Sequence, residues 1–138
     1  YTTKLTKDVI EKLPDTFFPC LAQEYIEKEY EIRTFYLDGS CYSMAIFSQA
    51  DKQTATDFRK YNREKPNRTG PYKLPKEIEI KIDEVMKSTK LNTGSLDIIK
   101  SKDGRYVFLE VNPSGQFGMV SYPCNYYLER EISKWLCN

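Results

Sequence analysis

The sequence predicts an α+β domain with an antiparallel sheet flanked by helices, which we expect mainly on one side. Short apolar runs have strand periodicity, two Asp-Gly pairs separate such runs as tight turns, and two segments repeat apolar residues at helical spacing. The 138 residues suffice for one domain with a single core. The expected strands are residues 20–26, 31–37, 41–47, 95–101 and 106–112, in an order that the sequence does not fix.

The first third of the chain contains the clearest hairpin. A short amphipathic helix is predicted over residues 7–13, with Thr6 as a candidate cap and Pro14 as its stop. The run 20–26 then has strand composition. In residues 31–37 the side chains alternate between two faces, and Asp38-Gly39 turns the chain into the next strand.

Residues 48–73 are polar, rich in arginine, and without an apolar repeat. Long unpatterned loops inside compact domains are usually functional or disordered. The arginines favour a loop that faces a substrate, and a merely solvated loop is the alternative.

Two later segments have helical spacing. Pro75 precedes a predicted helix over residues 76–88, and a final helix is predicted over residues 125–136. The first should bury Ile78, Ile82, Val85 and Met86, and the second Tyr127, Leu128, Ile132, Trp135 and Leu136. Between them, Asp103-Gly104 joins two strands, and residues 112–118 form a loop marked by glycine and proline.

Composition excludes several classes of function. The net charge is +1, which gives no reason to expect a nucleic-acid partner. The chain has no histidine, so Ser-His-Asp and Cys-His catalysis are excluded, and its four cysteines form no C-x-x-C pair that would suggest zinc. Four cysteines could form two disulfides, but the composition favours free thiols. No apolar run approaches the length of a membrane span.

Two carboxylates interrupt apolar strands. Asp97 lies among Leu96, Ile98 and Ile99, and Glu110 lies within the run 107–111. Both are equally far from the Asp103-Gly104 turn, so antiparallel pairing should place them roughly opposite each other. Asn112, two residues further on, should project to the same face as Glu110.

Such a set of oxygen ligands suits Mg²⁺, especially when phosphate oxygens and water complete the coordination shell. The alternative is that Asp97 and Glu110 are paired with lysine or arginine, because a buried carboxylate requires a partner. Spacing alone leaves both interpretations open.

The segments SLDII and FLEVNP resemble the end of the ATP-grasp ligases. The resemblance implies that Asp97, Glu110 and Asn112 hold two Mg²⁺ ions on the phosphates of ATP. It further implies that residues upstream bind nucleotide: Gln23, Glu24, Tyr25 and Ile26 as the strand beside adenine, Glu31 and Arg33 in the following motif, and Arg68 at the γ-phosphate or acyl phosphate. Arg33 and Arg68 would also assist catalysis electrostatically.

Further segments resemble the ATP-grasp peptide maturases of the grasp-with-spasm and microviridin type, including PCLAQEYIEKEYEIRTFYLDG, DFRKYN and FLEVNPSGQFG. These segments span nearly the whole chain. The resemblance implies a ligase that joins side-chain carboxylates of a ribosomally made precursor peptide to hydroxyls or amines through an acyl phosphate. Asp57 and Arg59 match a motif thought to read the acceptor carboxylate, although an arginine in a polar loop is often only solvated.

The resemblance implies ATP and two Mg²⁺ ions as cofactors, with Mn²⁺ as a substitute. It also implies a precursor peptide as partner, no nucleic acid or membrane as partner, and a cytoplasmic location. The oligomeric state is not fixed by the sequence, and a homodimer is one option. The chain starts at Tyr1 with residues that read as mid-domain sequence. We therefore expect residues 1–138 to be the C-terminal ATP-grasp lobe of a longer protein, inactive without its N-terminal domain and first lobe.

Two alternatives remain at this stage. One is a module that binds nucleotide or peptide without turnover. The other is an ATP-grasp ligase of a different substrate class, such as one that adds glutamate or another amino acid to a protein.

Overall fold

The computed structural model describes residues 4–48 and 67–137. Its centre is a five-stranded antiparallel sheet in the order β3-β2-β1-β4-β5. The strands are β1 (Lys28–Leu37), β2 (Ser40–Phe47), β3 (Arg68–Tyr72), β4 (Thr93–Ser101) and β5 (Tyr106–Asn112). The helices are α1 (Lys7–Ile10), α2 (Lys76–Ser88), α3 (Gly118–Cys124) and α4 (Leu128–Leu136). The α+β class is confirmed.

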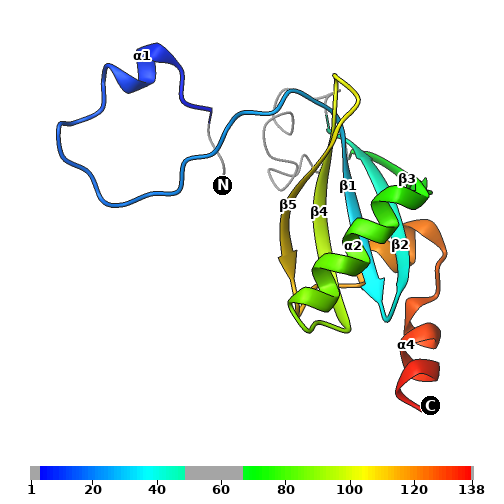
Figure 1. The fold of residues 1–138 in the computed structure, drawn as a ribbon. Helices are drawn as coiled ribbons and strands as arrows, with labels where there is room; N and C mark the ends of the chain where they lie inside the picture. Colours follow the sequence, from blue (N-terminus) through cyan, green and yellow to red (C-terminus); the bar gives the residue numbers. More distant parts are fainter. Residues whose placement is uncertain (1–3, 49–66, 138) are drawn as a thin grey trace.

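The segment before β1 differs from the prediction. Residues 20–26 form no strand, because within the described part of the chain they have no neighbouring strand to pair with. They belong to an extended stretch that leads away from the sheet (Figure 1). The short helix α1 begins after Thr6, as predicted, but the Thr6 side chain makes no capping hydrogen bond and the helix ends at Ile10.

The two hairpins have the predicted turns. Asp38 and Gly39 both have positive φ, 42° and 90°, which is the geometry of a type I′ turn and matches the twist of β1 and β2. At the second turn Gly104 has φ of 89°. Strand β1 is three residues longer at its start than predicted, and it lies at the centre of the sheet between β2 and β4.

Two elements were not predicted. Strand β3 lies within the segment interpreted as a loop and pairs with β2 at the edge of the sheet. Its residues include Gly70 and Pro71, which strands disfavour, so its composition hides it. Helix α3 begins at Gly118, includes Pro123, and ends before Asn125, which has a left-handed conformation. The helix predicted over residues 125–136 begins three residues later, as α4.

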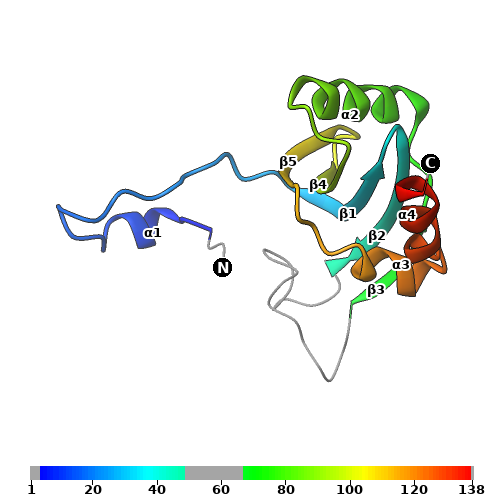
Figure 2. The ribbon, with the colours of Figure 1, turned by 90° about the horizontal axis from the view of Figure 1, so that it is seen from below.

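Helices cover both faces of the sheet, which corrects the expectation of helices mainly on one side (Figures 1 and 2). On the α2 face, Ile82 and Met86 are buried in a core with even-numbered residues of β1 and β4. Val85 points outward and is 38% exposed, contrary to the prediction. The hydroxyls of Tyr30, Tyr72 and Tyr106 form a hydrogen-bonded chain from β1 to both edge strands, with oxygen distances of 3.3 and 2.6 Å. The sheet therefore curls toward α2.

Helices α3 and α4 cover only part of the opposite face. Their core joins Val120, Cys124 and Leu128 to apolar residues of β1 and β2, with Ile132 and Trp135 packed at its margin. Tyr127 and Leu136 were predicted to face inward, but they are 57% and 70% exposed. The half of this face formed by β4 and β5 is not covered by these helices.

The packing of α4 leads to a prediction about stability. Leu128 is fully buried, so Leu128→Ala should lower the free energy of unfolding by about 2–5 kcal/mol through lost burial and a residual cavity. Leu136→Ala on the same helix is the control and should change it by less than about 0.5 kcal/mol. Chemical denaturation measures both, and equal effects would contradict the packing described here.

Candidate active site

The register of β4 and β5 is set by a β-bulge. Near the turn, Ile98 pairs with Phe108 and Ile99 with Val107; beyond it, Asp97 pairs with Glu110. Leu109 is therefore the extra residue. A straight strand continued from the turn would place Leu109 opposite Asp97 and direct Glu110 toward α2. The bulge brings Glu110 to the same face as Asp97, a re-aiming of side chains that bulges often provide beside active sites.

Three charged residues consequently form a row across adjacent strands. Arg33 on β1 pairs with Asp97 on β4, and Asp97 pairs with Glu110 on β5. Asn112 pairs with Ser95 one position further along the same face. The predicted juxtaposition of Asp97, Glu110 and Asn112 is thus present in the register, on the half of the sheet beside α3 and α4.

Arg33 and Asp97 form an ion pair. The Nη1 atom of Arg33 donates to both carboxylate oxygens of Asp97, at 2.7 and 2.8 Å. The side chains are only 13% and 17% exposed. Asp97 is therefore paired with an arginine, as the alternative interpretation of the sequence predicts. The pair does not use the whole guanidinium, because the buried Nε atom of Arg33 has no hydrogen-bond partner in the described part of the chain. That N–H is available to an additional acceptor.

Asn112 is held at the start of a tight turn. Its Oδ1 atom accepts a hydrogen bond from the backbone N–H of Ser114 at 3.1 Å, and its carbonyl oxygen accepts one from the N–H of Gly115 at 3.0 Å. The first bond orients the Asn112 side chain, and the second closes the backbone turn that carries it. An amide oxygen has a second lone pair, so Oδ1 can still bind a cation.

Glu31 is buried beside Arg33 and is fully engaged. Its Oε1 atom pairs with the Nζ of Lys28 at 2.7 Å, and its Oε2 atom accepts a hydrogen bond from the Ser48 hydroxyl at 2.7 Å. Lys28 and Ser48 were not predicted as site residues. A lysine at the start of a central strand, three residues before a glutamate, was the only signal in the sequence.

Other predicted site residues lie elsewhere. Arg68 is the first residue of β3, and its guanidinium lies 5.2 Å from the centre of the Phe47 ring. By strand parity this is the α2 face, opposite to Arg33. Gln23, Glu24 and Tyr25 are exposed and Ile26 is half-buried in the extended stretch before β1. Asp57 and Arg59 lie outside the described residues.

The residues in the row fit a divalent cation by their chemistry. Among the described residues, Lys28 and Arg33 stand against Glu31, Asp97 and Glu110, which gives two basic groups and three acidic ones. A surface with this balance repels a polyphosphate unless cations are added. Within residues 4–48 and 67–137, no three His, Cys, Asp or Glu side chains gather as a metal site. A site here therefore depends on the Asn112 oxygen and on oxygens from the ligand.

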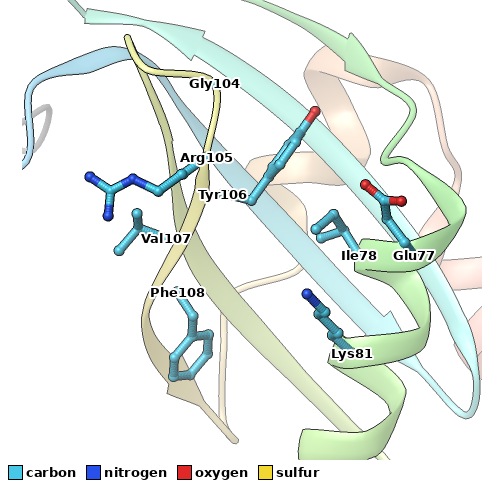
Figure 3. A pocket seen from close by; sticks show the side chains of 8 residues that line it. All are labelled: Glu77, Ile78, Lys81, Gly104, Arg105, Tyr106, Val107 and Phe108. Carbon is cyan, nitrogen blue, oxygen red and sulfur yellow. The ribbon is translucent and has the colours of Figure 1, made fainter.

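A separate hollow of about 510 Å³ lies between α2 and β5, on the other face of the sheet (Figure 3). It contains none of the site residues predicted from the sequence. Its lining is formed by Glu77, Ile78, Lys81, Gly104, Arg105, Tyr106, Val107 and Phe108. We assign no chemistry to it.

The perturbed thiol and phenol groups also lie away from the row. Burial raises the pKa of the Cys41 thiol to about 12, so this thiol is protonated and unsuited to nucleophilic attack. Burial, together with a hydrogen bond to Asp83, raises the pKa of Tyr36 to about 12. All four cysteines are free, as predicted. No helix in the described part of the chain is long and apolar enough to cross a membrane.

The fold agrees with a comparison to protein families. Residues 2–136 match the family described as RimK-like ATP-grasp domain. The chain therefore belongs to the RimK-like ATP-grasp family, as its motifs predict. The search of curated proteins gives no match.

Two of the solved structures that are similar to this chain contain a bound peptide. The macrocyclase MdnC of Microcystis aeruginosa MRC, bound with precursor peptide MdnA, is 35% identical with a TM-score of 0.68; the match covers 82% of this chain and 35% of MdnC. A RiPP-associated ATP-grasp ligase of Chryseobacterium gregarium, in complex with ADP and a leader and core peptide, is 31% identical with a TM-score of 0.64, covering 79% and 32%. This chain thus spans about a third of their length.

Proposed function

We propose that this chain is the C-terminal lobe of an ATP-grasp ligase that modifies a ribosomally made precursor peptide. The observation that carries the proposal is the row Arg33, Asp97 and Glu110 with Asn112 beside it, since it collects oxygen ligands and a guanidinium on one open face. The two peptide-modifying ligases that are 35% and 31% identical support the substrate class. We also propose that the full-length protein contains an N-terminal domain and a first ATP-grasp lobe besides these residues.

The proposed reaction has two steps. A side-chain carboxylate of the peptide attacks the γ-phosphorus of ATP, giving an acyl phosphate and ADP. A hydroxyl or amine of the peptide then attacks the acyl carbon, loses its proton, and releases phosphate, leaving an ester or amide. No protein nucleophile is required, which agrees with the absence of histidine. Most of the rate enhancement would come from positioning and electrostatics.

The residues have distinct roles in this proposal. Asp97, Glu110 and Asn112 would hold two Mg²⁺ ions, or Mn²⁺ in their place, and bound Mg²⁺ supplies positive charge that stabilises the phosphate oxygens. Arg33 anchors Asp97 through Nη1 and offers its unpartnered Nε–H to a phosphate oxygen. The electrostatic contribution rests on Arg33, because Arg68 lies on the opposite face, and the role of Arg68 stays a prediction.

Adenine is proposed to bind along Gln23, Glu24, Tyr25 and Ile26, which precede β1, with Glu31 nearby. Glu31 is buried between Lys28 and Ser48, so its role is to shape the site. The reaction requires ATP, which agrees with a cytoplasmic location. A homodimer is compatible with the proposal, and the molecular mass of the full-length protein in solution tests whether it forms.

The experiment is a ligation assay on the full-length protein with its precursor peptide. We expect the peptide to lose the mass of one water for each bond formed, only when ATP and Mg²⁺ are present. A peptide whose mass is unchanged under all conditions, while nucleotide still binds, would instead support a binding module without turnover.

Arg59 provides a test of peptide recognition. A guanidinium can hold a carboxylate through two hydrogen bonds, so Arg59→Ala should raise the KM for the peptide about tenfold, with the KM for ATP within about twofold. The neighbouring Lys60→Ala is the matched control for loss of a positive charge. If both variants respond alike, Arg59 has no specific role in recognition.

A further inference from the structure

Gly115 lies against a central strand more closely than any other residue type would allow. A Cβ atom at this position would come 2.3 Å from both the Cβ and the Oγ of Ser95, and 2.7 Å from the Ser95 backbone nitrogen. Contacts this short do not occur, so a side chain would have to move the turn or the strand by roughly 1 Å.

Ser95 cannot yield easily. It is 1% exposed, and it lies in β4 between β1 and β5, where it pairs with Phe35 on one side and Asn112 on the other. Its Oγ atom is buried and has no hydrogen-bond partner among the described residues. Any adjustment therefore falls on the turn.

The turn carries Asn112. Its sequence Asn112-Pro113-Ser114-Gly115 has the residues preferred in a type I turn, and the Gly115 N–H closes it on the Asn112 carbonyl. The Ser114 N–H, one residue before Gly115, holds Asn112 Oδ1. Displacing Gly115 from Ser95 thus disturbs the backbone bond that closes the turn and, with it, the Ser114 bond that orients the Asn112 side chain.

We propose that Gly115 is a positioning residue for Asn112, with the absence of a side chain at 115 seating the turn on Ser95 so that the Asn112 oxygen joins Asp97 and Glu110. The inference rests on the proposed function, because it concerns the divalent-cation site. It makes the backbone contact between residues 95 and 115 a determinant of cation affinity, although neither residue is itself a ligand.

The test is titration of the full-length protein with ADP, with and without Mg²⁺. Gly115→Ala should weaken ADP binding about 10- to 100-fold in the presence of Mg²⁺, the usual effect of disturbing a residue that orients a metal ligand. Binding without Mg²⁺ should stay within about twofold. A purely structural role would change both affinities alike.

Two further variants sharpen the test. In Ser95→Gly/Gly115→Ala the Cβ and Oγ that would clash are removed while the backbone nitrogen remains, so part of the Mg²⁺-dependent affinity should return. Gly70→Ala is the matched control, because an added Cβ there meets no atom within 4 Å, and it should bind ADP as the unchanged protein does. Failure of the double variant to recover any affinity overturns the inference.

Asn112→Ala separates the inference from the proposed function. Loss of Mg²⁺-dependent affinity in Asn112→Ala but not in Gly115→Ala overturns the inference alone. An unchanged Mg²⁺ effect in Asn112→Ala overturns both. Should Gly115→Ala not fold, Ser95→Thr presses on the turn from the other side with one added methyl. A smaller loss of the same kind supports the inference, and an unchanged Mg²⁺ effect overturns it.

Discussion

Asp97→Asn should reduce ligation by the full-length protein at least about 10³-fold, equivalent to roughly 4 kcal/mol of transition-state stabilisation. The change keeps the size of the side chain but removes the negative charge that pairs with Arg33 and that would bind the cation. Peptide binding should stay nearly unchanged, because Asp57 and Arg59, which are predicted to bind the peptide, are kept. A mass-spectrometric ligation assay and a peptide-binding titration measure the two effects separately.

Asp103→Asn is the matched control for this prediction. It makes the same chemical change at the turn of the same hairpin, where Asp103 pairs with Arg105 at the surface. Exposed pairs of this kind contribute little. Normal turnover by Asp97→Asn, or an equal loss in both variants, would remove Asp97 from the proposed site.

The second large effect concerns stability. Arg33→Met removes the guanidinium that holds Asp97, whose side chain is only 17% exposed, and it should lower the free energy of unfolding by about 2 kcal/mol or more. The double variant Arg33→Met/Asp97→Asn also removes the negative charge of Asp97 and should recover part of the loss, so the two changes are not additive. Denaturant unfolding of all three variants measures the coupling.

Arg105→Met breaks the exposed pair with Asp103 and should change stability by less than about 1 kcal/mol. This control separates loss of an arginine from loss of a partly buried partner. If Arg33→Met and Arg105→Met were equally stable, the pair with Asp97 would have no structural role and Arg33 would serve only the ligand.

Local sequence signals predicted much of the sheet. The Asp38-Gly39 and Asp103-Gly104 pairs are true turns, and the strands beside them lie close to where alternation placed them. Asp97 and Glu110 were expected opposite each other from their distance to the turn, and they are. Equal distance from the turn gave the right partners only because of the bulge. Near the turn Ile98 pairs with Phe108, and the extra residue Leu109 then shifts the register so that Asp97 pairs with Glu110.

The failures have tertiary causes. Strand β3 is made of residues that disfavour strands and forms because β2 offers an edge. The run 20–26 has strand composition but no strand beside it in the described chain. The close contact of Gly115 with Ser95 and the burial of Lys28 with Glu31 each depend on residues brought together by the sheet, which no spacing along the chain reveals.

The most direct test of the account is calorimetric titration of the full-length protein with ADP, with and without Mg²⁺, repeated for Asp97→Asn and Glu110→Gln. We expect binding that strengthens with Mg²⁺ in the unchanged protein and loses that dependence in both variants. Binding that is equally strong with and without Mg²⁺, or a Mg²⁺ effect retained in both variants, would contradict the assignment of Asp97 and Glu110 as ligands of the cation.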